Sequence, residues 1–234
     1  MKMKKLTALI CVLMMLICTA APALAATKFS ASTPKDAQLK ALSLVERCGF
    51  SSEYQGTRDM VRWETPIRIY VGGKPTKADL NTLDNFLVQI AARAPGVPNM
   101  TRVGREQDAN VCIWFVPQNQ MGNYVPGYVK GNTGMFNYTY KNWRINEAHI
   151  GVVSDKTSQR DRNHIIPEEI VGILGLSNDH EVYSDSILYE KRSTYTELSE
   201  VDWLMINMIY HPDVYPGMTW NSFYQKTLNR INRR

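Results

Sequence analysis

The sequence predicts an α+β fold in which a twisted mixed sheet packs against a central helix, with further helices at the C-terminal end. Three observations predict this class. Strand-like segments between residues 63 and 153 are interrupted by one helical segment. A buried helical segment follows and ends at Gly175. Two more helical segments, each with one apolar stripe, occupy the region after residue 198. Strands followed by helices are typical of the α+β class.

The first 25 residues are identified as a secretory signal peptide. Three lysines near the start precede an apolar run over residues 6–19, and Ala23-Leu24-Ala25 forms a small-x-small cleavage site. The apolar run is too short for a membrane-spanning helix. We therefore expect cleavage after Ala25, no stable membrane span in the mature protein, and a location in the periplasm or outside the cell.

Cleavage would remove 25 of the 234 residues and three of the 27 lysines and arginines, which leaves 24 basic against 22 acidic residues and a net charge of +2. A chain of this length is expected to form one domain, residues 60–234, preceded by an extension with a short helix over residues 26–59. Basic residues cluster only at the tail, at Arg230, Arg233 and Arg234. The expected partners therefore include no nucleic acid.

Cap signals place the first two helices. Thr33 precedes a proline, which is favoured at the first helical position, and this helix is expected to run to about Cys48. Thr76 precedes Asp79 by three residues, which is the spacing of a capping box, and an Ala-Pro-Gly stop ends the second helix. Between the two helices, the alternating apolar residues of segment 63–71 predict a strand.

Four further strands are expected before the central helix. Residues 110–116 are apolar and rich in β-formers, which predicts a strand that is buried on both faces. Weaker strand signals cover residues 100–103, 135–140 and 145–153.

Six aromatic side chains crowd the region between residues 118 and 146, namely Tyr124, Tyr128, Phe136, Tyr138, Tyr140 and Trp143. One interpretation is ordinary packing on a sheet. The other is a binding ledge for a peptide or a glycan, because tyrosine and tryptophan combine an apolar face with a polar tip. On this second interpretation the candidate ligand-binding residues are Tyr124, Tyr128, Tyr138, Trp143, and Asn178 and Asp179 from the turn after the central helix.

The central helix is predicted by four apolar residues between positions 170 and 174, whose spacing suits a helix with little exposed surface. Gly175 falls where a left-handed C-terminal cap is expected, and Asn178-Asp179 supplies turn chemistry. Because proline is best tolerated in a first helical turn, Pro167 is expected there, which would leave His164 before the helix.

Gly175 also aligns this helix with a known motif. In the pattern H-E-x-x-H-x-x-G-x-x-H of metzincin metallopeptidases, three histidines hold zinc and the glutamate polarises a water molecule. When Gly175 is placed on the glycine of the motif, Glu169 falls on the general base, and the ligand positions become Glu168, Gly172 and Asn178. The segment therefore resembles a metzincin helix without its zinc chemistry, because a glycine has no side chain to bind with and an amide is a poor zinc ligand.

Later segments extend the resemblance. Residues 183–188 lie where the matrixins place the Met-turn, although this turn contains no methionine. The segment Leu198-Ser199-Glu200-Val201-Asp202 is similar to the opening of the last matrixin helix, which closes much as Ile209-Tyr210 does here. The pattern E-E-x-x-x-x-L-G-L-x-N-D is similar to a bacterial family of secreted proteins of unknown function that is related to matrixin-type peptidases. The resemblance covers roughly residues 60–218 and implies a zincin-like fold, whereas activity depends on the site.

The chemistry-bearing residues of this region leave alternatives open. Glu169 is a general base if the protein is an active peptidase, and otherwise a carboxylate that is favourable near a helix N-terminus. His164 and Glu168 lie four residues apart, and His180 follows the turn, so these three residues could form a rebuilt metal site. The alternative is that they are ordinary polar surface residues.

Two cysteines remain after cleavage, Cys48 and Cys112. In an oxidising compartment the pair is expected to form a disulfide, which would close a long loop and add about 4 kcal/mol of stability. The alternative is two separate buried thiols, since Cys112 lies in the apolar segment 110–116.

Together these observations predict a metal-free pseudoenzyme related to matrixin-type peptidases, which binds a peptide, a protein or a cell-wall ligand through the old cleft or the aromatic edge. No cofactor is expected. The first alternative is a divergent metal-dependent hydrolase that uses zinc at the rebuilt site. The second is a purely structural protein of the cell envelope.

Overall fold

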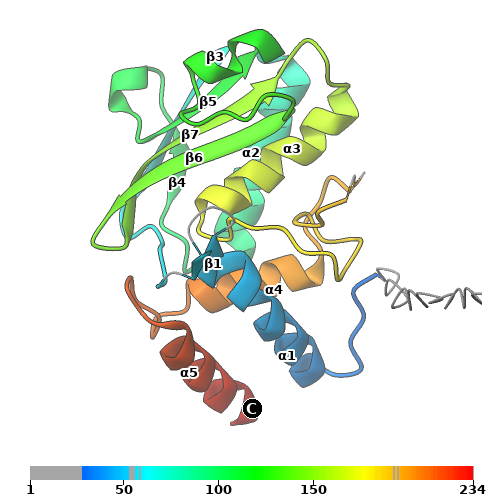
Figure 1. Ribbon diagram of the computed structural model, residues 1–234, viewed down its shortest axis with the longest axis vertical. Helices are drawn as coiled ribbons and strands as arrows, with labels where there is room; N and C mark the ends of the chain where they lie inside the picture. Colours follow the sequence, from blue (N-terminus) through cyan, green and yellow to red (C-terminus); the bar gives the residue numbers. More distant parts are fainter. Residues whose placement is uncertain (1–27, 53–55, 58, 192, 194, 234) are drawn as a thin grey trace, which may run out of the picture.

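The computed structural model describes residues 28–52, 56–57, 59–191, 193 and 195–233. The expected signal peptide, residues 1–25, lies outside these described residues. The described chain is a mixed α/β structure in which a five-stranded, mostly parallel sheet lies on one side of a group of helices (Figure 1). Among the described residues, no helix is long and apolar enough to cross a membrane.

The strands follow the spatial order β4 (Met100–Arg102), β3 (Ile67–Gly73), β5 (Val111–Val116), β7 (Arg144–Val153) and β6 (Gly134–Lys141). The first four strands are parallel to one another, and β6 runs antiparallel to β7 at one edge of the sheet. The sequence therefore places all five strands, although the first one starts at Ile67 rather than at residue 63. A separate two-stranded ribbon joins β1 (Ser51–Ser52) to β2 (Gly56–Thr57).

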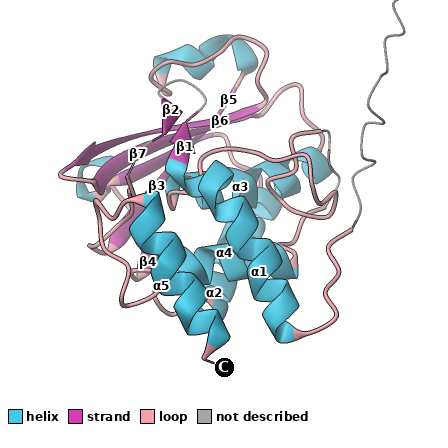
Figure 2. Cartoon of the chain, turned by 60° about the horizontal axis from the view of Figure 1, so that its bottom comes forward, coloured by secondary structure: helices cyan, strands magenta, loops and turns pink. Residues whose placement is uncertain are grey.

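The helices form two groups (Figures 1 and 2). In the first group, α2 (Lys77–Arg93) contacts α3 (Gln159–Ile173), and α3 packs on β6 and β7. In the second group, α1 (Pro34–Val45) packs on α4 (Glu200–Ile209) and α5 (Trp220–Asn232). A π-helical turn, Glu46–Phe50, follows α1 directly.

Strand β5 carries the core on both of its faces. Ile113 and Phe115 belong to the main hydrophobic core, whereas Val116 packs with Met121 and Val153 in a small cluster on the other face. This burial on both faces confirms the sequence-based expectation for β5. The N-terminal extension also contributes to the main core, through residues of α1 and the following turn such as Ala41, Leu42, Val45 and Phe50.

The predicted cap of α2 is present. The Thr76 hydroxyl accepts a hydrogen bond from the Asp79 N–H at 3.1 Å, and the Asp79 carboxylate accepts one from the Thr76 N–H at 2.8 Å. Asp79 is also bonded to Arg162 of α3, at 2.9 Å, so the cap fixes α2 against the central helix.

The start of α3 differs from the expectation. The helix begins at Gln159, and Pro167 lies in its interior, so His164 is part of the helix. Ser158 and Asp161 form a capping box, in which the Ser158 hydroxyl accepts from the Asp161 N–H at 3.1 Å. This box is visible in the sequence as S-x-x-D, a start signal that the prediction from Pro167 did not include.

An interior proline removes one helical hydrogen bond and costs about 3 kcal/mol. Two neighbouring side chains, Ile165 and Ile166, are buried in the core, and burying such a side chain contributes about 1.5–3 kcal/mol. Packing and the N-terminal cap therefore offset the proline, which is why the helix continues through it.

The end of α3 follows the expectation at Gly175, which has φ +108°. A Cβ atom at this position would also come within 2.4 Å of the Val61 carbonyl oxygen. Two aromatic donors satisfy the last carbonyls of the helix: Trp63 Nε1 donates to Ile173 at 2.8 Å, and the Tyr210 hydroxyl donates to Leu174 at 2.9 Å.

The two cysteines are free and buried in the structure. Cys48 lies in the π-helical turn after α1, and Cys112 lies in β5. The expected disulfide is therefore absent from the structure, which shows the alternative of two separate thiols. Burial raises the pKa of both, that of Cys112 to about 11, so neither is an activated thiolate.

Candidate functional site

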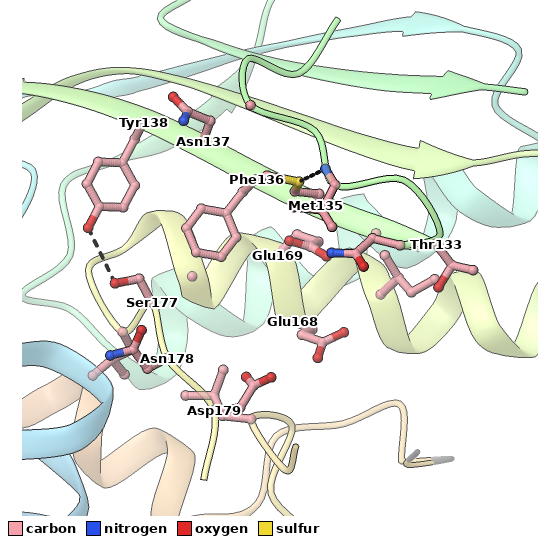
Figure 3. A pocket seen from close by; sticks show the side chains of 18 of the residues that line it. Thr133, Met135, Phe136, Asn137, Tyr138, Glu168, Glu169, Ser177, Asn178 and Asp179 are labelled. Carbon is pink, nitrogen blue, oxygen red and sulfur yellow. Dashed lines mark hydrogen bonds between the residues drawn. The ribbon is translucent and has the colours of Figure 1, made fainter. Parts of the chain in front are cut away.

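A cleft of about 820 Å³ lies between the edge strand β6 and the central helix α3 (Figure 3). The loop 126–133 closes one end, and the turn 176–179 lies at the other end. Side chains of α3 form the floor, among them Ile165, Glu168 and Glu169. The edge of the sheet, the central helix and two loops therefore enclose one elongated space.

The side chains of β6 that face α3 are those at alternate positions, because successive residues of a strand point to opposite faces. Gly134 lies over Glu169, Phe136 lies over Gly172, and the Tyr138 hydroxyl donates to Ser177 Oγ at 3.4 Å. These three positions form the upper wall of the cleft.

The main chain of β6 is oriented for pairing with a further strand. Tyr138 lies opposite Ala148 of β7, and the N–H of Ala148 donates to the carbonyl of Asn110 on the β5 side, at 3.0 Å. Hydrogen-bonded and non-bonded pairs alternate along an antiparallel ladder. Tyr138, and by alternation Phe136 and Gly134, therefore direct their N–H and C=O groups away from β7, towards the edge of the sheet.

Gly134 and Glu169 are in close contact. A Cβ atom at position 134 would come within 2.3 Å of Glu169 Oε1 and within 2.4 Å of Ile165 Cγ2. The missing side chain of Gly134 therefore leaves the space that the Glu169 carboxyl occupies beneath the strand (Figure 3). Glu169 is only 6% exposed.

Phe136 and Gly172 are in equally close contact. A Cβ atom at position 172 would lie 2.2 Å from Cε1 of the Phe136 ring. Gly172 is the position that aligns with the second zinc ligand of the metzincin motif. Phe136 occupies the space that a side chain at this position would need.

Burial, together with neighbouring carboxylates, raises the pKa values of both glutamates on the floor of the cleft. Burial raises the pKa of Glu168 to about 8, and the nearby carboxylate of Asp179 adds to this effect. Burial raises the pKa of Glu169 well above its usual range, and repulsion from Glu168 and Asp179 acts in the same direction. Burial and the neighbouring carboxylates therefore favour the uncharged form of both glutamates.

His164 and Glu168, two residues of the alternative metal site, are neighbours on α3. His164 Nδ1 is bonded to the carbonyl of Tyr195, which can only accept, so Nδ1 carries the proton. Burial lowers the pKa of His164, so the ring is neutral and Nε2 presents its lone pair to Glu168 Oε2, 3.5 Å away.

His180, the third residue of that alternative, lies fully buried in the loop after α3. Its Nδ1 accepts from the Val182 N–H at 3.2 Å and its Nε2 is bonded to Ser186 Oγ at 3.0 Å. Burial lowers the pKa of His180 to about 4. Within the described part of the chain, no three His, Cys, Asp or Glu side chains are arranged to hold a metal ion. The structure thus gathers two of the three residues and uses the third elsewhere.

The same loop contains serine, histidine and aspartate in contact, but in an arrangement that is structural. Ser186 Oγ donates to Asp202, so the carboxylate is bonded to the serine and not to the histidine of a catalytic triad. Ser186 and Asp202 are both fully buried. Asp202 also accepts from the N–H groups of Ile187 and Ser199, so this network ties the loop to the N-terminus of α4.

Of the predicted ligand-binding residues, Tyr138, Asn178 and Asp179 line the cleft. Asn178 Nδ2 donates to the carbonyl of Arg47 at 2.9 Å, and Arg47 Nε donates to the carbonyl of Asp179 at 2.7 Å. These bonds fix the turn against the end of α1. The third ligand position of the metzincin motif, Asn178, is therefore engaged in holding the fold.

The other three predicted residues lie elsewhere. Tyr124 stacks on Trp114 at 4.5 Å, and both Tyr124 and Tyr128 pack on the small hydrophobic cluster of the opposite sheet face. Trp143, 43% exposed, lies in the β6–β7 turn beside Gly217. Tyr124 and Tyr128 therefore pack on the sheet and Trp143 lies in an exposed turn, whereas Phe136 and Tyr140 join Tyr138 in the cleft wall.

The structure is similar to two solved structures of myroilysin. One is 13% identical in sequence, with a TM-score of 0.44, and the match covers 80% of this chain and 99% of that chain. The other is 12% identical, with a TM-score of 0.40, and covers 65% and 83% of the two chains. No curated protein matches the chain.

The sequence matches a known family over most of the folded part. Residues 46–226, from the end of α1 to the middle of α5, match the family described as "Protein of unknown function (DUF2927)". The matched region includes all of β3 to β7, the central helix and the cleft between them. The chain therefore belongs to the DUF2927 family, whose function is unknown.

Proposed function

We propose that this protein is exported and binds an extended peptide segment along β6, in the cleft above α3. The observation that carries the proposal is the orientation of the edge strand β6. Its main-chain groups at Gly134, Phe136 and Tyr138 point away from β7, towards the edge of the sheet that borders the cleft. An extended peptide that pairs with such an edge gains main-chain hydrogen bonds, and its alternate side chains enter the space below. The signal peptide expected at residues 1–25 supports export to the periplasm or beyond.

We further propose that the scaffold is zincin-like and that it binds without cutting. The order of strands and helices supports the first part, because an antiparallel edge strand lies over the helix that resembles the metzincin motif. The residues at the zinc-ligand positions of the motif support the proposal of binding without cleavage. Phe136 fills the space above Gly172, and the Asn178 amide is bonded to the Arg47 carbonyl, so the residues at the ligand positions do not fit a zinc ion.

The binding proposal is tested with the mature protein, residues 26–234, immobilised and exposed to a display library of random peptides. Selected peptides are synthesised, and their dissociation constants are measured in solution by calorimetry. We expect binding in the micromolar range. N-methylation of every second peptide amide should weaken binding by at least roughly tenfold, because only alternate amides of an added strand face β6. Failure to select any peptide, or equal effects at all amides, contradicts the proposal.

A matched pair of variants tests whether the peptide binds along β6. Tyr138→Pro removes an N–H that faces the edge and leaves the β6–β7 hydrogen bonds in place, whereas Tyr138→Ala keeps that N–H and removes the same ring. We expect the proline variant to bind the selected peptide clearly less tightly than the alanine variant does. Equal affinities would show that the peptide binds elsewhere.

The proposal of binding without cleavage has its own measurement. The selected peptide is incubated with the mature protein and zinc, and mass spectrometry follows its length. We expect the peptide to remain intact. Cleavage that disappears in a Glu169→Gln variant would instead identify a metal-dependent hydrolase.

A further inference from the structure

We infer that the cleft selects a peptide with a positively charged side chain, held by Glu169 and Glu168, at the position that pairs with Gly134. This inference rests on the proposed function, because it names the kind of ligand that the same cleft takes. It follows from the acidic residues that line the cleft, from the burial of Glu169 and from the register of β6.

The lining of the cleft is acidic. Among the described residues that line it, none is lysine or arginine, and the acidic ones are Glu168, Glu169, Asp179 and Glu190. Arg47 forms an ion pair with Glu190 at 3.1 Å and donates to the carbonyl of Asp179. It therefore offsets negative charge at the end of the cleft formed by the turn 176–179. On α3, the His164 ring lies 3.5 Å from Glu168, and burial lowers the pKa of this ring.

Glu169 is the second observation that points to a ligand. Its side chain lines the cleft and is 94% buried, since only 6% of the residue is exposed. Within the described residues its carboxyl makes no hydrogen bond and no ion pair. A carboxyl that is largely removed from water loses part of its hydration, and this cost is larger when the group is charged. A donor or a cation supplied by a ligand would remove this cost.

Glu168 gives the site a second carboxyl. It lies on the same helix, and its side chain keeps 26% of its surface exposed, on the cleft side of α3. A cation that lies between two carboxylates is attracted by both and screens their mutual repulsion. A guanidinium or ammonium group provides this charge and several hydrogen-bond donors at once.

The register of β6 predicts which residue of the bound peptide carries the positive charge. Gly134, Phe136 and Tyr138 direct their side-chain positions towards α3, and residues directly opposite one another on paired strands point to the same face. A ligand residue opposite Gly134 therefore points to Glu169, whereas residues opposite Phe136 and Tyr138 point to the apolar and hydroxyl-bearing part of the cleft. Because Gly134 has no side chain, only the ligand supplies one there.

The first test compares matched peptides at neutral pH and low salt. Each arginine or lysine of a selected peptide is replaced in turn by its neutral isostere, citrulline or norleucine. We expect one replacement to weaken binding by at least roughly tenfold and the others to have little effect. Glu169→Gln, which resembles the protonated acid in size, should bring the charged and neutral peptides to similar affinities. Glu200→Gln, an exposed change on α4, is the matched control and should leave the difference intact.

The outcomes separate the two proposals. Equal binding of charged and neutral peptides overturns the charge inference and leaves the binding function standing. When no peptide binds at all, the proposed function fails, and a small probe decides the charge inference by itself. The probe is n-butylguanidinium, with n-butylurea as its neutral counterpart, added to the mature protein in an NMR titration.

Shifts of the Glu168 and Glu169 amide signals with the guanidinium, absent with the urea and absent in Glu169→Gln, support a cation site. Equal responses to both probes, or no response to either, overturn it. Added salt should weaken guanidinium binding, because screening reduces an attraction between charges.

Discussion

The ring of Phe136 lies on the Cα atom of Gly172, so closely that a Cβ atom there would be 2.2 Å from Cε1 of the ring. The edge strand and the central helix meet at this contact, at the position where a metzincin would carry a zinc-binding histidine. The contact also brings the wall of the cleft close to its floor.

This contact predicts a strong coupling between positions 136 and 172. Gly172→Ala alone should lower the free energy of unfolding by roughly 1–3 kcal/mol, because the new methyl group displaces the ring. In a Phe136→Ala background the same change should raise it by about 1 kcal/mol, because alanine is the better helix former. Urea denaturation of the four proteins gives the coupling as a double-mutant cycle. Additive effects would mean that the ring does not lie on Gly172 in solution.

The hydroxyl of Tyr210 is predicted to hold the end of α3. It donates to the Leu174 carbonyl and accepts from the Trp63 N–H at 3.2 Å, and both partners are buried. Tyr210→Phe should therefore cost roughly 1–3 kcal/mol, because it leaves a buried donor and a buried acceptor without a partner. Tyr215→Phe, at a tyrosine that is 52% exposed, is the control and should cost little. Similar costs in both variants would argue against this role.

The buried network around Ser186 is predicted to stabilise the loop after α3. Ser186→Ala removes an acceptor from His180 and Leu188 and a donor from Asp202, all of which are buried. The expected loss is about 3 kcal/mol, measured by thermal or urea unfolding. The exposed Ser43→Ala in α1 serves as the control. A loss below that of the control would show that the network contributes nothing to stability.

Glu168 predicts a pH dependence of stability. Its pKa of about 8 in the folded protein lies above the ordinary value of 4.5, so the folded state binds more protons than the unfolded state between these pH values. The stabilisation is fully present below pH 4.5 and is lost as the pH rises through 8. One pKa unit corresponds to ~1.4 kcal/mol, so roughly 2 kcal/mol or more should be lost between about pH 5 and pH 9.

The measurement compares urea unfolding of the wild type and of Glu168→Gln across this range. The variant should lose less stability towards high pH, since glutamine does not ionise. His180 acts in the opposite direction at lower pH, because its pKa of about 4 lies below the ordinary 6.5 and its contribution is lost as the pH falls. It is present in both proteins and cancels in the comparison. Parallel pH profiles would contradict the pKa shift of Glu168.

Local signals account for the parts of the fold that the sequence predicts. The capping box at Thr76 and Asp79 and the cap at Gly175 are decided by residues within one turn of each other. The apolar segment that forms β5 has the composition of a strand buried on both faces, and it is one. The predicted start of α3 is wrong because it rests on Pro167 alone. The helix begins at the capping box of Ser158 and Asp161, and its packing offsets the interior proline.

The sequence by itself determined the strands, the helix caps and the resemblance of the 168–179 segment to a peptidase helix without its ligands. Tertiary structure alone decided the surroundings of that segment: the Phe136 ring over Gly172, the bond of the buried His180 to Ser186, and the placement of the buried Glu169 beneath Gly134. The physical reason is sequence distance. These contacts join a strand, a helix and a loop, and they depend on side-chain volumes and on the exclusion of water, which no local pattern records.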